Sequence, residues 1–391
     1  MQDCDVLIVG GGPAGLSVAS HLAADIKCII VHQDAKIGQP VRTSGGSFLA
    51  DMKALKIPDE YYQVIDKLDV FSDTARASIN IKSDKMVVLD IPKLYQYLAS
   101  LSDKNNRQIL LASKFISTVK QSDGKYISEI RNREIGQASI RSKYIIDASG
   151  WHCAVLNALG LVEKPARLGV GTEYEFVQKD YPDNRAILFV GSPVLSGYGW
   201  VFPTNYNTIR LGVGVIKPDT ENNPRDVMQT LLESGFLRKL GVEVPDDYTI
   251  NSGILPSIEF EGKVVFGNVI RVGDSANCAT PIAGEGIRIA IEQGRFLADA
   301  LNGTIAQNNP QKLQDYQTAY TKKYGRDYKI GYWANQRISK YGPKDWDRSV
   351  NRISKLQSSE ITDLLRSRFN FKNLLRTAFQ HLRRKIMGML K

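Results

Sequence analysis

The sequence predicts an α/β protein in which a parallel-sheet unit, an antiparallel sheet and a helical C-terminal tail follow one another. Three observations predict it: a strand, glycine turn, helix and strand at the N-terminus, short strand patterns in the middle, and helical spacing with basic charge at the end. The 391 residues suffice for two or three regions with their own cores. No run of 18 apolar residues occurs, so no membrane span is predicted.

The N-terminal unit begins with an apolar run at residues 6–9, which is typical of a buried parallel strand. A glycine-rich turn at 10–15, a helix pattern and a second apolar strand at 28–31 follow. This is a βαβ unit of about 30 residues around GxGxxG. The pattern predicts a dinucleotide site.

Each residue of the glycine turn has an expected role in that site. Gly10 allows the tight turn, Gly12 leaves room for a pyrophosphate, and Gly15 lets the helix pack closely on the strand. Pro13 and Ala14 open the helix, whose free N–H groups and positive dipole end favour a phosphate.

The acidic residue that usually binds the ribose after the second strand is absent. His32, Gln33 and Asp34 stand there, with His32 at the position expected for glutamate. The imidazole of His32 and the amide of Gln33 are candidates to bond a ribose hydroxyl, and Asp34 is a third if the strand ends later.

Two further strand ends point to the same site. Residues 143–150 end in D-A-S-G, which places Asp147 and Gly150 beside the dinucleotide. A second strand at 269–276 contains Gly273 and Asp274, and 281–287 then open a helix to about Leu301. Asp274 is expected either to bond a ribityl hydroxyl or to cap a helix.

GGGPAG at 10–15, DASG at 147–150 and GDSANCATPIAGEGI at 273–287 together resemble the FAD enzymes built like para-hydroxybenzoate hydroxylase. Within that group, GQPVR at 38–42 and YGWVFP at 198–203, followed eight residues later by GVG, resemble the geranylgeranyl reductase family and its YxWxFP…GxG signature. The resemblance covers about residues 1–305. It implies a Rossmann-like FAD-binding domain with an antiparallel-sheet substrate domain.

The family implies a reductase that saturates isolated C=C bonds of isoprenoid chains, with FAD reduced by NAD(P)H or another reductant. Tyr198, Trp200 and Phe202 would then line an apolar substrate tunnel, unless they simply pack in a sheet core. The N–H groups of Gly286 and Ile287 would begin a helix aimed at the flavin N1–C2=O edge. The remaining expected cofactor contacts are Arg42, Phe115, Pro281 and Gly284.

No side chain is a convincing catalytic acid or base, and water, Tyr198 and Glu285 are alternatives for the proton donor. Thr43 stands where the family often has cysteine, and Asp90 lacks the arginine that often follows it. Two alternative functions therefore stay open. One is a flavin-dependent monooxygenase or halogenase of the same fold, and the other is a flavoprotein that binds a partner or membrane without turnover.

The expected organisation has four parts. Residues 1–160 form the first part of the FAD-binding domain, with a substrate-side insertion near 40–100. Residues 161–265 form the antiparallel-sheet substrate domain, with a strand at 263–266 and a helix starting at Pro224. Residues 266–305 complete the FAD-binding domain, and 306–391 form a helical, basic C-terminal region.

Charge is concentrated in that C-terminal region. Residues 311–391 hold 19 Lys and Arg against six Asp and Glu, a net charge of 19 − 6 = +13. The whole chain has a net charge of +10, so the remaining residues carry 10 − 13 = −3. From Phe371 the apolar residues share one helical face, as in helices that lie on anionic membranes. The alternative is a helix docked on the protein body. No nucleic-acid partner is expected, and the oligomeric state is open.

Four cysteines without a CxxC pair and four histidines without HExxH predict no metal site. This cysteine usage and the absence of a signal-peptide pattern suggest a cytoplasmic protein, with peripheral association at the inner face of a membrane.

Overall fold

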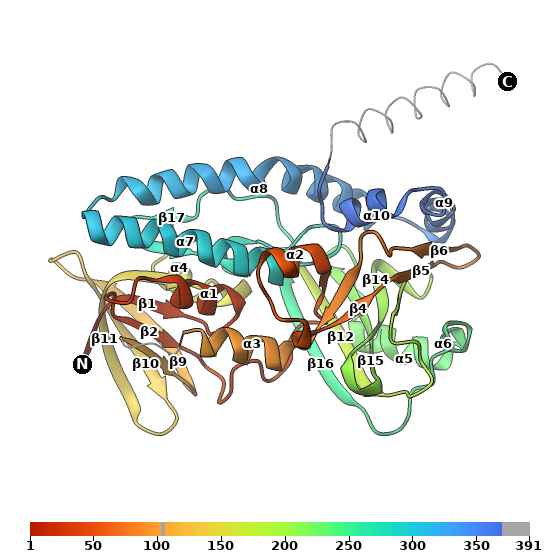
Figure 1. The fold of residues 1–391 in the computed structure, drawn as a ribbon, viewed down its shortest axis with the longest axis horizontal. Helices are drawn as coiled ribbons and strands as arrows, with labels where there is room; N and C mark the ends of the chain where they lie inside the picture. The colour runs from red at the N-terminus through yellow and green to blue at the C-terminus, as the bar shows by residue number, and fades with distance from the viewer. Residues whose placement is uncertain (103–105, 370–391) are drawn as a thin grey trace, which may run out of the picture.

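The computed structural model describes residues 1–102 and 106–369, which form two sheet-based lobes beneath long helices (Figure 1). The first sheet has the order β17-β18-β11-β1-β2-β8, and the hairpin β9–β10 extends from β11. Its strands are β1 (Gln2–Val9), β2 (Cys28–Val31), β8 (Arg107–Leu110), β9 (Ser113–Lys120), β10 (Tyr126–Asn132), β11 (Gly136–Asp147), β17 (Val265–Phe266) and β18 (Val269–Arg271). β18, β11, β1, β2 and β8 run parallel, so their carboxyl ends meet at one edge.

Helices cover one face of this sheet in layers. α1 (Pro13–His21) packs against α7 (Ile287–Gln307), and α8 (Gln311–Ile338) lies outside α7 (Figure 1). α3 (Ile91–Ser100) packs beside α1. The hairpin β9–β10 and α4 (Ala154–Ala158) cover the opposite face. α1 therefore starts at the carboxyl edge of the sheet, with α7 at its side.

The second sheet has seven strands in the order β16-β12-β15-β14-β13-β5-β6 and is antiparallel except where β13 meets β5. Its strands are β5 (Lys67–Phe71), β6 (Arg76–Asn80), β12 (Leu168–Val177), β13 (Arg185–Gly191), β14 (Val194–Pro203), β15 (Thr208–Lys217) and β16 (Thr249–Pro256). Two of these strands come from the segment near residues 40–100. The insertion is thus built into the second sheet.

Helices flank both faces of the second sheet. α5 (Pro224–Glu233) and α6 (Phe236–Leu240) fill one face. α9 (Pro343–Ile353) and α10 (Ser358–Leu365) pack on the other. A small sheet with the order β3-β7-β4 and helix α2 (Leu49–Ala54) lie between the lobes (Figure 1). Its strands are β3 (Gly46–Phe48), β4 (Tyr62–Ile65) and β7 (Met86–Leu89), and short 3-10 turns occur at Asp59–Tyr61, Gly150–His152, Asn205–Asn207 and Gly273–Ala276.

The predicted fold class is confirmed: a Rossmann-like domain, a mainly antiparallel sheet and a helical C-terminal region are all present. The N-terminal βαβ unit and the helix starting at Pro224 are as predicted. The strand predicted at 263–266 in the middle sheet is wrong, because β17 pairs with β18 in the first sheet.

The helix predicted to end near Leu301 continues to Gln307. Within this last part of the helix, the Asn302 side chain accepts from Ala23 N–H and donates to the His21 carbonyl at the end of α1. The amphipathic helix predicted from Phe371 lies outside the described residues. In the part of the chain that is described, no helix combines the length and apolar character needed to cross a membrane.

Candidate active site

A cavity of about 1470 Å³ runs from the carboxyl edge of the first sheet to the inner face of the second sheet and to α9 and α10. Ligand pockets typically measure about 300–1,000 Å³. The cavity therefore has room for a cofactor and a second molecule side by side.

The glycine turn forms one end of this cavity. Gly10 has a φ of +119°, and a Cβ there would lie 2.1 Å from the carbonyl oxygen of Ala148, so only glycine fits. A Cβ on Gly12 would meet nothing within 4 Å, and Gly12, Pro13 and Ala14 line the cavity. Gly15 lies behind them, since its Cβ would meet the Gly10 carbonyl at 2.1 Å. An open space thus faces the start of α1, where a phosphate is favoured.

His32 lies at the same end, directly after β2. Its Nδ1 accepts a hydrogen bond from the Gly11 N–H at 3.2 Å, so the neutral ring carries its proton on Nε2. Burial lowers the pKa of His32 and keeps the ring neutral, although Asp34 opposes this shift. Nε2 is buried and has no hydrogen-bond partner among the described residues. Asp34 Oδ2 lies 3.7 Å from it, beyond hydrogen-bonding distance, so the Nε2–H at the cavity wall is suited to donate to a ribose hydroxyl.

Asp34 and Arg42 form the neighbouring part of the rim. The Arg42 guanidinium donates to both carboxylate oxygens of Asp34, at 2.7 and 3.0 Å. Gln33, Phe115 and Gly150 also line this part of the cavity. Asp34 is thus already engaged, whereas the His32 Nε2 remains available.

Asp147 does not reach the cavity, contrary to the role expected from the sequence. Its carboxylate is fully buried and accepts hydrogen bonds from Ser149 N–H and hydroxyl, from Ser275 hydroxyl, and from the N–H groups of Val155 and Leu156. These five hydrogen bonds hold the start of α4 and the turn after β18 against Asp147. Asp147 therefore holds the cavity wall in place, and Ser149 and Gly150 form the lining.

The middle of the cavity is formed by the turn before α7. Gly273, Asp274, Pro281, Gly284, Gly286 and Ile287 all line it. Helix α7 begins at Ile287, so the first N–H groups of a helix of 21 residues lie at this wall. Burial raises the pKa of Asp274 to about 6, although the Cys278 thiol, 3.6 Å away, lowers it slightly. Tyr95 of α3 also lines this region and was not found from the sequence.

The aromatic residues of β14 line the cavity on the second lobe. A Cβ on Gly212 would lie 2.1 Å from the six-membered ring of Trp200, so the indole lies flat on a strip of glycine. Its Nε1 donates to Glu173 at 2.8 Å. Phe202 lies next to Trp200, with ring centroids 6.3 Å apart. The glycines of the GxG pattern thus make the space that this ring occupies.

Glu173 is a buried carboxylate that the sequence analysis missed. It lies 3.8 Å from the Arg210 guanidinium and accepts from the Asn251 amide at 3.4 Å. Burial raises the pKa of Glu173, although Arg210 and the Trp200 indole oppose the shift. Arg210 also donates to the carbonyls of Ser44 and Leu89. This cluster ties the Trp200 ring to the segment after Arg42.

Tyr198 faces the turn before α7. Its hydroxyl donates to the Ala283 carbonyl at 2.5 Å, and burial raises the pKa of the phenol to about 12. The phenol therefore keeps its proton at neutral pH. It joins the second sheet to the wall formed by Pro281 and Gly284.

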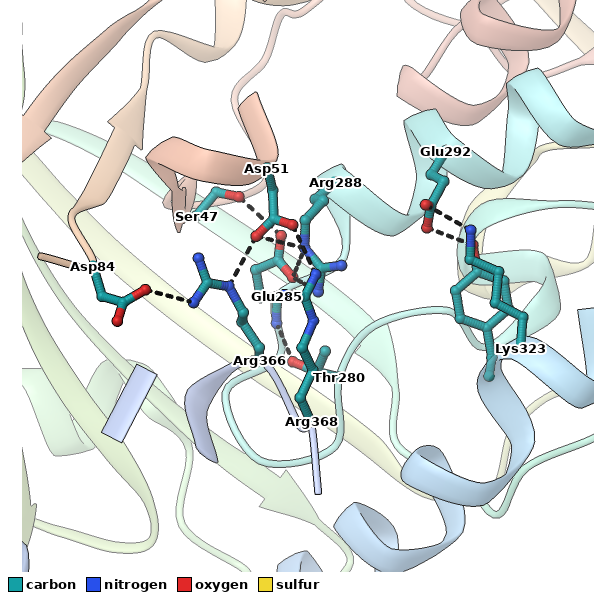
Figure 2. Close-up of polar contacts among 11 residues, drawn as sticks. Ser47, Asp51, Asp84, Thr280, Glu285, Arg288, Glu292, Lys323, Arg366 and Arg368 are labelled. Atoms are coloured by element: carbon teal, nitrogen blue, oxygen red, sulfur yellow. Dashed lines mark hydrogen bonds and ion pairs between the residues drawn. The ribbon is translucent and has the colours of Figure 1, made fainter. Parts of the chain in front are cut away.

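Figure 2 shows where Glu285, the other candidate proton donor, is held. Its carboxylate accepts from the Ser47 hydroxyl at 3.0 Å and from Arg288 at 2.9 Å. Its backbone N–H donates to the Thr280 hydroxyl at 3.1 Å. Glu285 is thus fixed within an ion pair.

The same network reaches the C-terminal segment (Figure 2). Asp51 of α2 accepts from Arg366 at 2.9 Å and from Arg368 at 2.8 Å, and Arg288 lies 3.8 Å away. Burial alone would raise the pKa of Asp51, but the three arginines outweigh it and lower the pKa. The Arg366 guanidinium also stacks 4.0 Å from the centre of the Phe48 ring. The end of α10 is thereby tied to the turn before α7.

The structure gathers nearly all the residues expected at the site. The cavity lining includes Gly10, Gly12, Pro13, Ala14, His32, Gln33, Arg42, Phe115, Gly150, Gly273, Asp274, Pro281, Gly284, Gly286, Ile287, Tyr198, Trp200 and Phe202. Gly15 and Asp147 stand behind it. Among the described residues, no cluster of three or more His, Cys, Asp or Glu could hold a metal ion, and the four cysteines are buried and unpaired.

Comparison with known proteins decides the family. A model of the family described as an FAD binding domain matches residues 3–323. The chain belongs to this FAD binding domain family. It is an FAD-dependent oxidoreductase, and the open space at Gly12 and the unpaired Nε2 of His32 fit that cofactor.

The relatives confirm the resemblance to geranylgeranyl reductases. Digeranylgeranylglycerophospholipid reductase 3 of Methanosphaera stadtmanae is 25% identical over 408 residues, which cover 100% of this chain and 99% of that protein. A geranylgeranyl bacteriochlorophyll reductase-like structure from Thermoplasma acidophilum matches with a TM-score of 0.82 and 22% identity, over 91% of this chain and 93% of that one. A p-nitrophenol 4-monooxygenase from Pseudomonas putida matches with a TM-score of 0.72 and 20% identity, over 94% and 96%. The last two likenesses show a shared fold.

Proposed function

We propose that this protein saturates C=C bonds of a hydrophobic isoprenoid substrate, with FAD as its cofactor. One observation carries the proposal: the end of the cavity beyond Trp200 is apolar and continuous with the cofactor end. Its lining includes Leu68, Val70, Leu188, Val350, Ile361 and Leu365. A prenyl chain offers no hydrogen-bonding groups, and a wall of this kind suits it.

At the cofactor end of the cavity, different residues are proposed to bind different parts of FAD. We propose that Gly12 and the start of α1 hold the pyrophosphate, that the His32 Nε2 donates to the ribose of the adenosine, and that Asp274 accepts from a ribityl hydroxyl. The first N–H groups of α7 would then face the flavin ring. FAD, once reduced, supplies the hydride for the alkene.

The electron donor is proposed to be NAD(P)H or another anionic reductant. Four cationic or ionisable side chains line the cavity near its cofactor end: Arg42, Lys114, His152 and Lys164. Burial lowers the pKa of His152, and the positive charges of Lys164, Arg42 and Lys114 lower it further. A negatively charged donor would be attracted to this rim.

The pKa of Asp274 predicts how FAD affinity depends on pH. Burial raises this pKa to about 6, so the ionised carboxylate, which accepts the hydrogen bond from a hydroxyl, predominates only above that pH. We expect the dissociation constant of FAD to fall about tenfold from pH 5 to pH 7, because the ionised fraction of the Asp274 side chain increases by about that factor over this range. Fluorescence quenching during FAD titration of the apoprotein measures it. In Asp274→Asn the same step should be absent, and a step that persists in this variant would assign it to another group.

The function itself is tested by mass spectrometry. Reduced protein is incubated without oxygen with a geranylgeranyl lipid and, separately, with a polyprenyl quinone. Each saturated bond adds two mass units, so a ladder of such increments is expected. If every prenyl compound keeps its mass while the flavin stays reduced, the reductase proposal fails.

Admission of air separates the reductase from the monooxygenase or halogenase alternative. A reductase of this kind is expected to reoxidise slowly after anaerobic reduction when no substrate is present. Rapid oxygen capture, with oxygen- or halide-dependent product formation from an aromatic compound, would favour the alternative. A protein that retains FAD but cannot be reduced would support a binding role without turnover.

A further inference from the structure

The outer face of α8 carries a stripe of basic residues around one exposed tryptophan. Its members on the helix are Lys322, Arg326, Lys329, Trp333 and Arg337, Lys340 follows two residues after the helix ends, and all are exposed. Their spacing of three or four residues places them on one side of the helix. The inner side of α8 packs on α7, so this stripe faces away from the body of the protein (Figure 1).

Little within the described chain neutralises the stripe. Between Lys322 and Lys340 the only acidic residue is Asp327, and it is paired with Arg326 at 2.8 Å. Trp333 is 63% exposed, the only tryptophan in the described residues with such exposure, and the Arg337 guanidinium lies 6.0 Å from its ring centre. A large aromatic ring surrounded by cations is typical of surfaces that meet a membrane interface.

The last described residue, Phe369, lies against the stripe. Arg326 of the stripe donates to the carbonyl of Phe369 at 2.6 Å. The remaining residues, 370–391, contain six Lys and Arg and no Asp or Glu. This basic segment therefore follows directly in sequence from a residue that the stripe contacts.

The apolar end of the cavity reaches the surface nearby. Arg352 of α9 is exposed and also lines the cavity, together with Val350 and Ile353 of the same helix. α9 follows α8 after a short turn, and its exposed side bears Lys344, Arg348 and Arg352 at helical spacing, with Lys355 just beyond its end. A second row of positive charge thus stands where the lining of the cavity includes an exposed residue of α9.

We infer that the α8 stripe docks the protein on a bilayer that contains anionic lipid, with Trp333 at the interface, so that the cavity wall at Arg352 lies close to the membrane surface. Anionic lipids attract each nearby Lys or Arg, and tryptophan prefers the headgroup region. The choice of a bilayer as partner rests on the proposed prenyl-lipid substrate. A polyanion such as nucleic acid lacks the apolar layer that would receive Trp333.

The test is cosedimentation of the full-length holoprotein with vesicles of phosphatidylcholine, with and without phosphatidylglycerol. We expect binding that requires phosphatidylglycerol and weakens with salt. The triple variant Lys322→Gln, Lys329→Gln, Arg337→Gln should bind about 100-fold more weakly, since each charge near the surface contributes roughly a factor of five. A matched control removes three exposed charges from the β9–β10 side, Lys120→Gln, Arg131→Gln and Arg133→Gln. It should bind like the unaltered protein.

Trp333 gives a second readout. Brominated lipid should quench part of the protein fluorescence, and Trp333→Phe should remove that quenched part while the other three tryptophans remain. Equal vesicle binding by the triple variant and its control would overturn the inference and leave the tail as the sole contact. Tight binding of duplex DNA without vesicle binding would also overturn it. Stripe-dependent vesicle binding without any alkene saturation would uphold the surface and reject only the proposed reaction.

Discussion

Asp147→Ala is expected to lower the free energy of unfolding by about 3–5 kcal/mol, one of the largest effects of any single substitution in this chain. The carboxylate is fully buried and accepts five hydrogen bonds, from Ser149, Val155, Leu156 and Ser275. Hydrogen bonds to a charged group contribute about 1.5–3 kcal/mol each, and donors left unsatisfied in a core add a desolvation cost. Relaxation and water entry keep the total below the simple sum.

Urea unfolding of the FAD-free protein measures this change as a lower midpoint. Asp147→Asn keeps one acceptor oxygen but turns an N–H group toward the remaining donors, so an intermediate midpoint is expected. Asp123 serves as a matched control, because this carboxylate is exposed and pairs with Arg141 at the surface. Its alanine variant should unfold at nearly the same urea concentration as the unaltered protein.

FAD affinity separates this account from a direct ligand role. If Asp147 acts only through the wall it supports, Asp147→Asn should weaken FAD binding in proportion to its loss of stability, since Ser149 and Gly150 line the cavity. A variant with unchanged stability and strongly reduced affinity would instead place the carboxylate at the cofactor.

The sequence predicted most of the residues that line the cavity at the carboxyl edge of the first sheet, because the patterns that mark them are local. A glycine turn between two apolar strands fixes the βαβ unit, and parallel strands bring their carboxyl ends to one edge. The role of Asp147 was not predictable in this way. A carboxylate after a strand suggests a ligand, whereas its actual partners lie at Ser149, Val155, Leu156 and Ser275 and become visible only in three dimensions.

The lining of the cavity on the second lobe was predicted only in part. The aromatic residues of β14 were found from their motif, but the apolar wall contributed by α9 and α10 was not. The ion pair between Asp51 and Arg366 was also missed, since its two residues are 315 positions apart in the sequence. No local pattern encodes such contacts. Glu173 did carry a usable signal, because strand alternation places it on the same face as Gly171 and Glu175.

The second large effect is expected at Gly212, where alanine should reduce kcat/KM for a prenyl substrate about 100-fold with little loss of bound FAD. A Cβ at this position would lie 2.1 Å from two ring atoms of Trp200, far inside van der Waals contact. Gly212 is the cross-strand neighbour of Trp200 on β15, so the indole must move toward the cavity. A displacement of about 1 Å at a reacting centre can cost a factor of about 100 in rate.

Gly214 is the matched control, because it stands two residues further along the same strand and also faces Trp200. Its Cβ would lie 3.4 Å from the ring, which is ordinary contact, so Gly214→Ala should keep most of the activity. Tryptophan fluorescence gives a readout independent of turnover. The Gly212→Ala spectrum should shift as the indole leaves its bond to Glu173, and Glu173→Gln, which keeps an acceptor for that bond, should shift it less.

The outcome distinguishes two roles for the GxG pattern. If both alanine variants remain active, the glycines serve only sheet packing and the orientation of the Trp200 ring does not limit the reaction. If Gly212→Ala alone loses activity while FAD content and unfolding midpoint are retained, the pattern exists to seat the ring. The YxWxFP and GxG segments would then act together: the glycines of β15 leave space for the Trp200 ring, and β14 presents its aromatic side chains as a flat wall to an apolar chain.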